Sequence, residues 1–167
     1  VLTLSGTGNM TNYDSEDALP WKDYRDKIKR VVIEPGIESI GNRAFYGCQK
    51  LESIAIPASV TALGDRAFKD CAALTTATFA EGSQLTVLGN SVFAGCTALE
   101  RVHIPASIVD IRNAAFSGCM ALERIRIPAN VTSIGESALQ GCSSLTTIIM
   151  EPVDPPKLSS NALSGCT

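Results

Sequence analysis

The chain has 167 residues, of which 45% are hydrophobic and 19% are charged, so it can bury a continuous core and is not a disordered protein. No run approaches the 18 consecutive apolar residues of a membrane-spanning helix, which argues against membrane insertion. The net charge of −3 argues against general nucleic-acid binding, because that function requires a basic face over many phosphates.

Residues 1–27 are predicted to form an N-terminal capping segment. Residues 1–10 are expected to be a strand or hairpin, and residues 11–19 a polar, acidic loop. Pro20 then opens a short helical segment in which Trp21, Tyr24 and Ile28 fall on one face. We expect this face to cover the first repeat, because an uncapped repeat array exposes both its core and its strand edge.

Residues 28–167 are predicted to form a solenoid, because one unit recurs along them about five times and ends in a truncated copy. The cysteines that mark the repeat are separated by 23, 25, 23, 23 and 24 residues, and they are Cys48, Cys71, Cys96, Cys119, Cys142 and Cys166. A period in the twenties is typical of repeat solenoids.

Each unit is predicted to contain two strands and a short helical turn. The spacing of Leu51, Ile54 and Ile56 is that of a strand buried on one face, and Pro57 ends the strand at a corner of the coil. Residues 60–64 form a second, shorter strand. The A-F-x-G-C segment then forms a helical turn whose glycine suits the left-handed region. Stacked units therefore build a parallel sheet on one face.

Two repeated positions are expected to form internal columns. Four phenylalanines share one position, which Leu139 and Leu163 continue, and they are Phe45, Phe68, Phe93 and Phe116. The cysteines are expected to be reduced and buried: residues stacked 4.7–4.9 Å apart with parallel Cβ vectors are too far apart for disulfides, which need about 3.5–4.5 Å between Cβ atoms. Disulfide pairing is the alternative in an exported protein, and zinc is disfavoured because no C-x-x-C pair is present.

The repeated motif I-G-x-x-A-F-x-G-C-x-x-L-x-x-I-x-I-P resembles the BspA-like leucine-rich repeats of bacterial cell-surface proteins. The resemblance spans roughly residue 28 to the C-terminus, with small departures at Asp70, Arg112, Leu139 and Leu163. It implies an exported, extracellular or cell-surface protein, often modular, that is used for adhesion or ligand capture. Residue 1 lies inside a strand-like stretch, so export would require a leader that has been removed.

The residue types needed for catalysis are sparse. His103 is the one histidine, which excludes a two-histidine metal site. The repeat phase points His103 outward and the neighbouring Cys96 and Cys119 inward, so they cannot form a nucleophilic pair. The sequence therefore predicts a protein that is not an enzyme and has no cofactor.

A basic patch on the outer face of the sheet is the strongest candidate for a binding site. The outward positions of two successive repeats bring together Arg101, His103, Arg124 and Arg126, bordered by Glu100 and Glu123. Such a patch on an acidic protein suits a carboxylate, a sulfate or an acidic partner surface. The alternative is that the glutamates neutralise the arginines in a solvated ladder.

The sequence leaves three functions to consider. The favoured function is a non-catalytic binding or adhesion module, expected to be a monomer, that recognises a host or matrix protein or an acidic glycan. The alternative is a passive structural spacer in a larger surface protein. An enzyme would need a site outside the repeats, for which residues 1–27 leave little room. Because the chain stops just before another strand would begin, we expect it to be cut from a longer protein.

Overall fold

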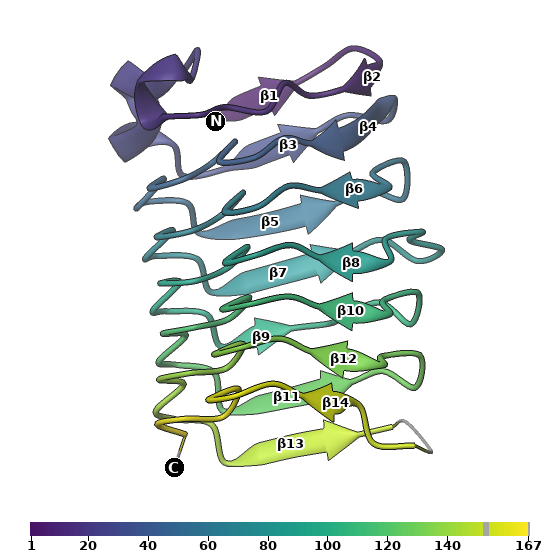
Figure 1. Ribbon diagram of the computed structural model, residues 1–167. Helices are drawn as coiled ribbons and strands as arrows, with labels where there is room; N and C mark the ends of the chain where they lie inside the picture. Colours follow the sequence, from purple (N-terminus) through teal and green to yellow (C-terminus); the bar gives the residue numbers. More distant parts are fainter. Residues whose placement is uncertain (152–153, 167) are drawn as a thin grey trace.

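The computed structural model describes residues 1–151 and 154–166 as a solenoid in which each coil adds a strand to each of two parallel ladders (Figure 1). The long-strand ladder contains β1 (Leu2–Leu4), β3 (Val31–Ile33), β5 (Ser53–Ile56), β7 (Thr76–Phe79), β9 (Arg101–Val102), β11 (Arg124–Ile127) and β13 (Thr147–Met150). The short-strand ladder contains β2 (Gly8–Asn9), β4 (Ile37–Ile40), β6 (Ala62–Leu63), β8 (Val87–Leu88), β10 (Asp110–Ile111), β12 (Ser133–Ile134) and β14 (Lys157–Leu158). This architecture confirms the predicted repeat solenoid.

The third side of each coil, the turn side, consists of residues 41–50 and their equivalents. It differs from the expected helical turn. In the first copy the N–H groups of Ala44, Tyr46 and Cys48 each donate to the carbonyl three residues earlier, while those of Arg43, Phe45 and Gly47 donate to the following coil. Because alternate N–H groups leave the local turn, consecutive β-turns form instead of a helix. Two of these three turns contain a residue with positive φ, Arg43 at 55° and Gly47 at 66°; in the next coil Asp70, which replaces the glycine, adopts 59°.

Both predicted internal columns are present. Phe45, Phe68, Phe93 and Phe116 are fully buried, and successive rings stack with centroids 5.2, 5.5 and 5.7 Å apart. Leu139 continues the column in the core, whereas Leu163 at its end is exposed. These ring contacts run from Phe45 to Phe116 and tie four successive coils together.

The six cysteines are free thiols, as predicted, and all but Cys166 are buried. Each thiol after the first donates a hydrogen bond to a backbone carbonyl of the preceding coil, as Cys71 Sγ does to Phe45 O at 3.2 Å. Burial raises the pKa of Cys48, Cys96 and Cys142 to about 12. The column therefore consists of protonated thiols that serve both as apolar filler and as hydrogen-bond donors.

The N-terminal segment closes the first coil through two of the three residues expected, Trp21 and Ile28. Trp21 precedes a 3-10 helix, η2 (Lys22–Lys27), stacks on Phe45 at 5.8 Å and donates its indole N–H to Ala44 O at 3.0 Å. Ile28 is buried as predicted, but Tyr24 is 63% exposed, so its predicted place in the cap is wrong. The two contacts of Trp21 fix the cap, and η2 then points Tyr24 outward beside Lys27.

Residues 1–10 extend the ladders instead of forming a hairpin. β1 pairs with β3 and β2 with β4, all in parallel. A second 3-10 helix, η1 (Glu16–Ala18), lies in the predicted loop. Paired strands thus begin ahead of residue 28; the division into a capping segment 1–27 and a solenoid 28–167 stays a prediction.

The strand ladders are interrupted at a few places along the solenoid. Among the described residues, the long strands pair as β1-β3, β5-β7-β9 and β11-β13, joined between β3 and β5 by one bridge, and the short strands break between β6 and β8. The interval from Cys71 to Cys96 is 25 residues, and its extra residues lie in the loop after β7, which projects beyond its neighbours in Figure 1. The break between β6 and β8 adjoins this wider coil, whereas β7 at its start still pairs with both β5 and β9.

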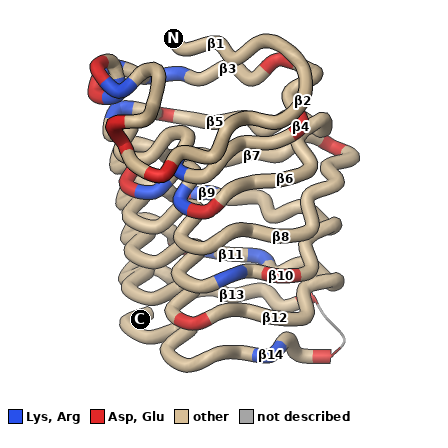
Figure 2. Tube along the Cα trace, turned by 45° about the horizontal axis from the view of Figure 1, so that its top comes forward, with Lys and Arg blue, Asp and Glu red and all other residues tan. Residues whose placement is uncertain are grey.

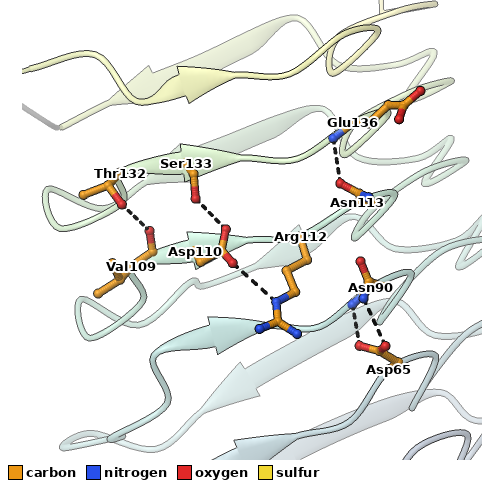
Figure 3. Close-up of polar contacts among 9 residues, drawn as sticks. All are labelled: Asp65, Asn90, Val109, Asp110, Arg112, Asn113, Thr132, Ser133 and Glu136. Atoms are coloured by element: carbon orange, nitrogen blue, oxygen red, sulfur yellow. Dashed lines mark hydrogen bonds and ion pairs between the residues drawn. The ribbon is translucent and has the colours of Figure 1, made fainter.

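A column of Asn and Asp side chains joins coils beside the short strands, which the sequence reading missed. The acceptor oxygens belong to Asn12, Asn42, Asp65 and Asn113, and each binds a backbone N–H of the next coil at 2.8 to 3.0 Å. Among the described residues the column skips Asn90, whose amide instead donates back to Asp65 Oδ2 at 3.0 Å (Figure 3).

Arg112 explains this gap. At the equivalent positions 41, 64, 89 and 135 the residue is glycine, because a Cβ atom would collide there. A Cβ on Gly135, for example, would lie 2.5 Å from Asn113 Oδ1. Arg112 carries that Cβ, and its guanidinium lies beside Asp110, with Nε 3.4 Å from Oδ2. The substitution therefore removes one link without disturbing the fold.

At the C-terminal end, Leu158 of β14 pairs with Ile134 of β12. The sequence has three prolines, Pro152, Pro155 and Pro156, after the last long strand, a composition expected to blunt the sheet edge; Pro152 lies outside the described residues.

Candidate functional site

The outer face of the long-strand ladder, here called the sheet face, changes along the solenoid. Along β5 and β7 the outward positions hold small neutral side chains such as Ser53, Ala55 and Thr78, while the inward positions hold buried apolar residues. The C-terminal half of the sheet face presents the predicted basic residues. The four predicted basic residues and two glutamates are all exposed, and they are Arg101, His103, Arg124, Arg126, Glu100 and Glu123.

All three arginines of this patch line one depression of about 370 Å³, here called the arginine depression. It lies over β9, β11 and β13, and Figure 2 shows the blue of Arg on β11 well away from the charged N-terminal region. Its lining consists of Glu100, Arg101, Val102, Glu123, Arg124, Arg126, Thr146 and Thr147. The depression therefore spans the place where β9 and β11 are not paired.

The charges in this depression are only partly compensated. Arg126 Nη1 forms an ion pair with Glu151, which the sequence reading did not include. Among the described residues, Arg101 and Arg124 form no ion pair, and neither do Glu100 and Glu123 beside them. Two guanidinium groups thus keep their donors available on the sheet face.

His103 is separated from the arginines. It lines a neighbouring depression of about 400 Å³, here called the loop depression, with residues of the projecting loop after β7 and of the corner after β9. Its lining is Phe79, Ala80, Glu81, Gly82, Ser83, His103, Pro105, Ala106 and Ser107. The predicted basic patch is therefore divided between two adjoining depressions.

The sequence reading missed Glu151, Thr146 and the projecting loop. The loop had a signal, since the interval from Cys71 to Cys96 exceeds the intervals on either side by two residues. Glu151 had a weaker one: it follows Arg126 by 25 residues, close to one repeat, but stands in an irregular corner. Neither signal shows which side chains meet.

A second group of cations lies on the turn side, near the N-terminal segment. Arg43, Arg66 and Lys69 line a depression of about 470 Å³ with Glu16 and Asp17. Glu16 forms an ion pair with Arg25, and Arg43 donates to Tyr13 O at 3.0 Å. Because the protein supplies its own acidic groups here, we do not favour this region as a ligand site.

The described residues offer little catalytic or metal-binding chemistry. Among them, no group of three or more His, Cys, Asp and Glu side chains is placed to hold a metal ion. Cys96 and Cys119 are buried in the core while His103 is exposed. Within the described part of the chain, no helix has both the length and the apolar character needed to span a membrane.

The comparisons with known proteins agree with the repeat. Residues 23–146 and 82–167 match the pattern described as the BspA type leucine rich repeat region, in six copies. The chain belongs to this family. Among functionally curated proteins, none matches this BspA-type chain.

Solved structures of bacterial leucine-rich repeat proteins share the fold. A leucine rich cell surface protein from Faecalibacterium prausnitzii is 43% identical over 71% of this chain and 31% of its own, with a TM-score of 0.68. A leucine-rich repeat protein from Bacteroides ovatus is 35% identical over 70% of this chain and 30% of its own, with a TM-score of 0.64.

A leucine-rich repeat protein from T. pallidum, 23% identical over 86% of this chain and 76% of its own with a TM-score of 0.58, shares the fold alone. The BspA-type chain spans about a third of the length of the two proteins with higher identity.

Proposed function

We propose that this BspA-type chain is a non-catalytic binding module of an exported, cell-surface protein, and that its sheet face binds an acidic ligand. The observation that carries the proposal is the pair Arg101 and Arg124, which share one depression and form no ion pair among the described residues. One similar protein is described as a cell surface protein, which supports the location.

The guanidinium groups of Arg101 and Arg124 have unused hydrogen-bonding capacity among the described residues. A guanidinium presents five N–H donors in a planar fork that matches a carboxylate or a sulfate, and charge-assisted hydrogen bonds are the stronger kind. Glu100 and Glu123 line the same depression, so a ligand must place its acidic group toward the arginines and other groups elsewhere. This arrangement favours recognition of a specific geometry over general attraction of anions.

A second candidate function is a passive spacer. It is favoured by the small, neutral outward side chains of β5 and β7 and by the chain spanning about a third of the length of similar proteins. A spacer needs no ligand, so the two functions differ in one measurable property.

Binding of defined polyanions separates them. The native chain is titrated against heparin, hyaluronan and poly-L-glutamate by biolayer interferometry in 0.15 M salt, as a monomer verified by light scattering. We expect one of these probes to bind, and Arg101→Glu with Arg124→Glu to weaken that binding more than tenfold, because hydrogen bonds to charged groups contribute about 1.5–3 kcal/mol.

The matched control is Arg30→Glu, an exposed arginine in the equivalent position of an earlier repeat that lines neither depression. It should leave binding within about twofold of the native chain. Equal losses in both variants would show general charge attraction, and no binding by any probe would favour the spacer.

A further inference from the structure

We propose that the acidic ligand is a glycan, with its charged sugar residue in the arginine depression and a neighbouring neutral residue in the loop depression. This inference rests on the proposed function, and adds to it a second site and the chemical class of the ligand. Its basis is the unlike chemistry of two depressions that adjoin on one face.

The two depressions meet within the chain. Val102 lines the arginine depression and the next residue, His103, lines the loop depression. His103 and Arg126 also occupy equivalent positions of successive repeats. A ligand that enters one depression therefore continues into the other over a short distance.

The loop depression is suited to an uncharged, hydroxyl-rich group. Phe79, Pro105 and Ala106 supply apolar surface, while Glu81, His103 and Ser107 supply hydrogen-bonding groups. A pyranose ring has the same mixture, with C–H groups on its faces and hydroxyls at its rim. The Glu81 carboxylate would repel a second acidic residue, which fits a neutral sugar beside a charged one.

Ser107 places a hydroxyl group in the lining of the loop depression. Its oxygen is buried and has no hydrogen-bond partner among the described residues, and the same holds for Ser59 in the equivalent corner of an earlier repeat. The missing partner is therefore a feature of this corner of the coil, and Ser107 differs from Ser59 in lining the depression.

A protein ligand is less well matched to this face. Protein interfaces depend on large apolar or aromatic anchors buried at their centre. The exposed large apolar side chains among the described residues are Val1, Tyr24, Val109, Met120, Met150, Leu158 and Leu163, and none of them lines either depression. The two volumes, about 370 and 400 Å³, lie in the range of small-molecule sites.

The test compares oligosaccharides with their charged monosaccharide. Hyaluronan, chondroitin sulfate and heparin tetrasaccharides, free glucuronate and poly-L-glutamate are titrated into isotopically labelled native chain, followed by NMR. At least one tetrasaccharide should bind more than tenfold more tightly than glucuronate and shift the backbone signals of Gly82 and Ser107. Glucuronate alone should shift signals around Arg101 and Arg124.

Two loop variants and a matched control complete the design. Glu81→Gln and Ser107→Ala should each weaken tetrasaccharide binding about fivefold, the worth of one hydrogen bond, and leave glucuronate binding unchanged. Ser59→Ala should change neither. Arg101→Ala should weaken both ligands.

Each negative outcome has one meaning. If poly-L-glutamate binds through the arginines but no tetrasaccharide exceeds glucuronate, the glycan inference is wrong and the acidic-ligand function stands. If a tetrasaccharide binds but neither loop variant weakens it, the neutral site is wrong. If no anion binds at all, the proposed function fails as well.

Discussion

The inward and outward positions of the same strands follow different rules. Inward, the coils repeat similar apolar residues: Ile54 and Ile125, three repeats apart, are both buried in the core. Outward, their neighbours diverge from Ser53 to Arg124. The interior must match from coil to coil because neighbouring coils share one core, whereas the outer face has no such constraint. The inward positions therefore determine the fold, whereas the outward positions determine the chemistry of the surface.

The largest expected effect on the uniform interior is a loss of folding stability at alkaline pH. Burial raises the pKa of five thiols, to about 12 for Cys48, Cys96 and Cys142, from an ordinary value of 9.0, so the folded state holds more protons than the unfolded state between about pH 9 and 12. Burial also raises the pKa of Cys71 and Cys119. Stability is therefore complete below pH 9 and falls as the pH rises.

One pH unit above the unfolded pKa, each buried thiol should cost on the order of 1 kcal/mol, so the five together should cost several kcal/mol. Urea titration at pH 7.5 and 10 measures the loss. Cys119→Ala should reduce the loss by about one thiol's share. A pH dependence identical in the variant would show that this thiol does not contribute.

The next largest effect is expected in the phenylalanine column. Phe93→Ala should lower the free energy of unfolding by about 3–5 kcal/mol, because the cavity opens between two stacked rings that cannot close it. Urea titration checks this, with the exposed Tyr24→Ala as a control that should change stability by less than about 0.5 kcal/mol. A loss below about 1 kcal/mol at Phe93 would mean that the column is not essential.

Glycines beside the Asn and Asp column should show a graded effect. Gly135→Ala should cost about 1–3 kcal/mol, because the new Cβ would lie 2.5 Å from Asn113 Oδ1 and 2.6 Å from its backbone nitrogen. Gly89→Ala should cost less, since its nearest atom is Asp65 Oδ1 at 2.9 Å. Thermal melting of the two variants gives the order, which a larger loss at Gly89 would contradict.

The smallest effect belongs to the outer face. Arg101→Glu with Arg124→Glu should change the free energy of unfolding by less than about 0.5 kcal/mol, because both side chains are exposed and neither forms an ion pair among the described residues. Denaturant titration measures it. A loss comparable to that of Phe93→Ala would remove the distinction between inward and outward positions.

The same distinction explains what could be read from the sequence. Inward positions were predictable because each must satisfy the same neighbours, so periodicity alone located the phenylalanine and cysteine columns. The ladder breaks were not, because the inward apolar residues continue unchanged across them. The separation of His103 from Arg101 follows from the projecting loop after β7, and the pairing of Arg126 with Glu151 from an irregular corner. Local departures thus decide the site.

The turn side also gives the solenoid a polarity. In successive coils the N–H groups at three alternate positions, as in Arg43, Phe45 and Gly47, all donate toward the C-terminal end. Aligned in this way, their peptide dipoles add as they do in an α-helix, with the negative end at the first coil. There the carbonyl of Ala44 receives the indole N–H of Trp21, and that of Asn42 receives the N–H of Tyr13. The N-terminal segment therefore acts as an electrostatic cap that only donors can replace, whereas the opposite end would accept carbonyl or anionic groups.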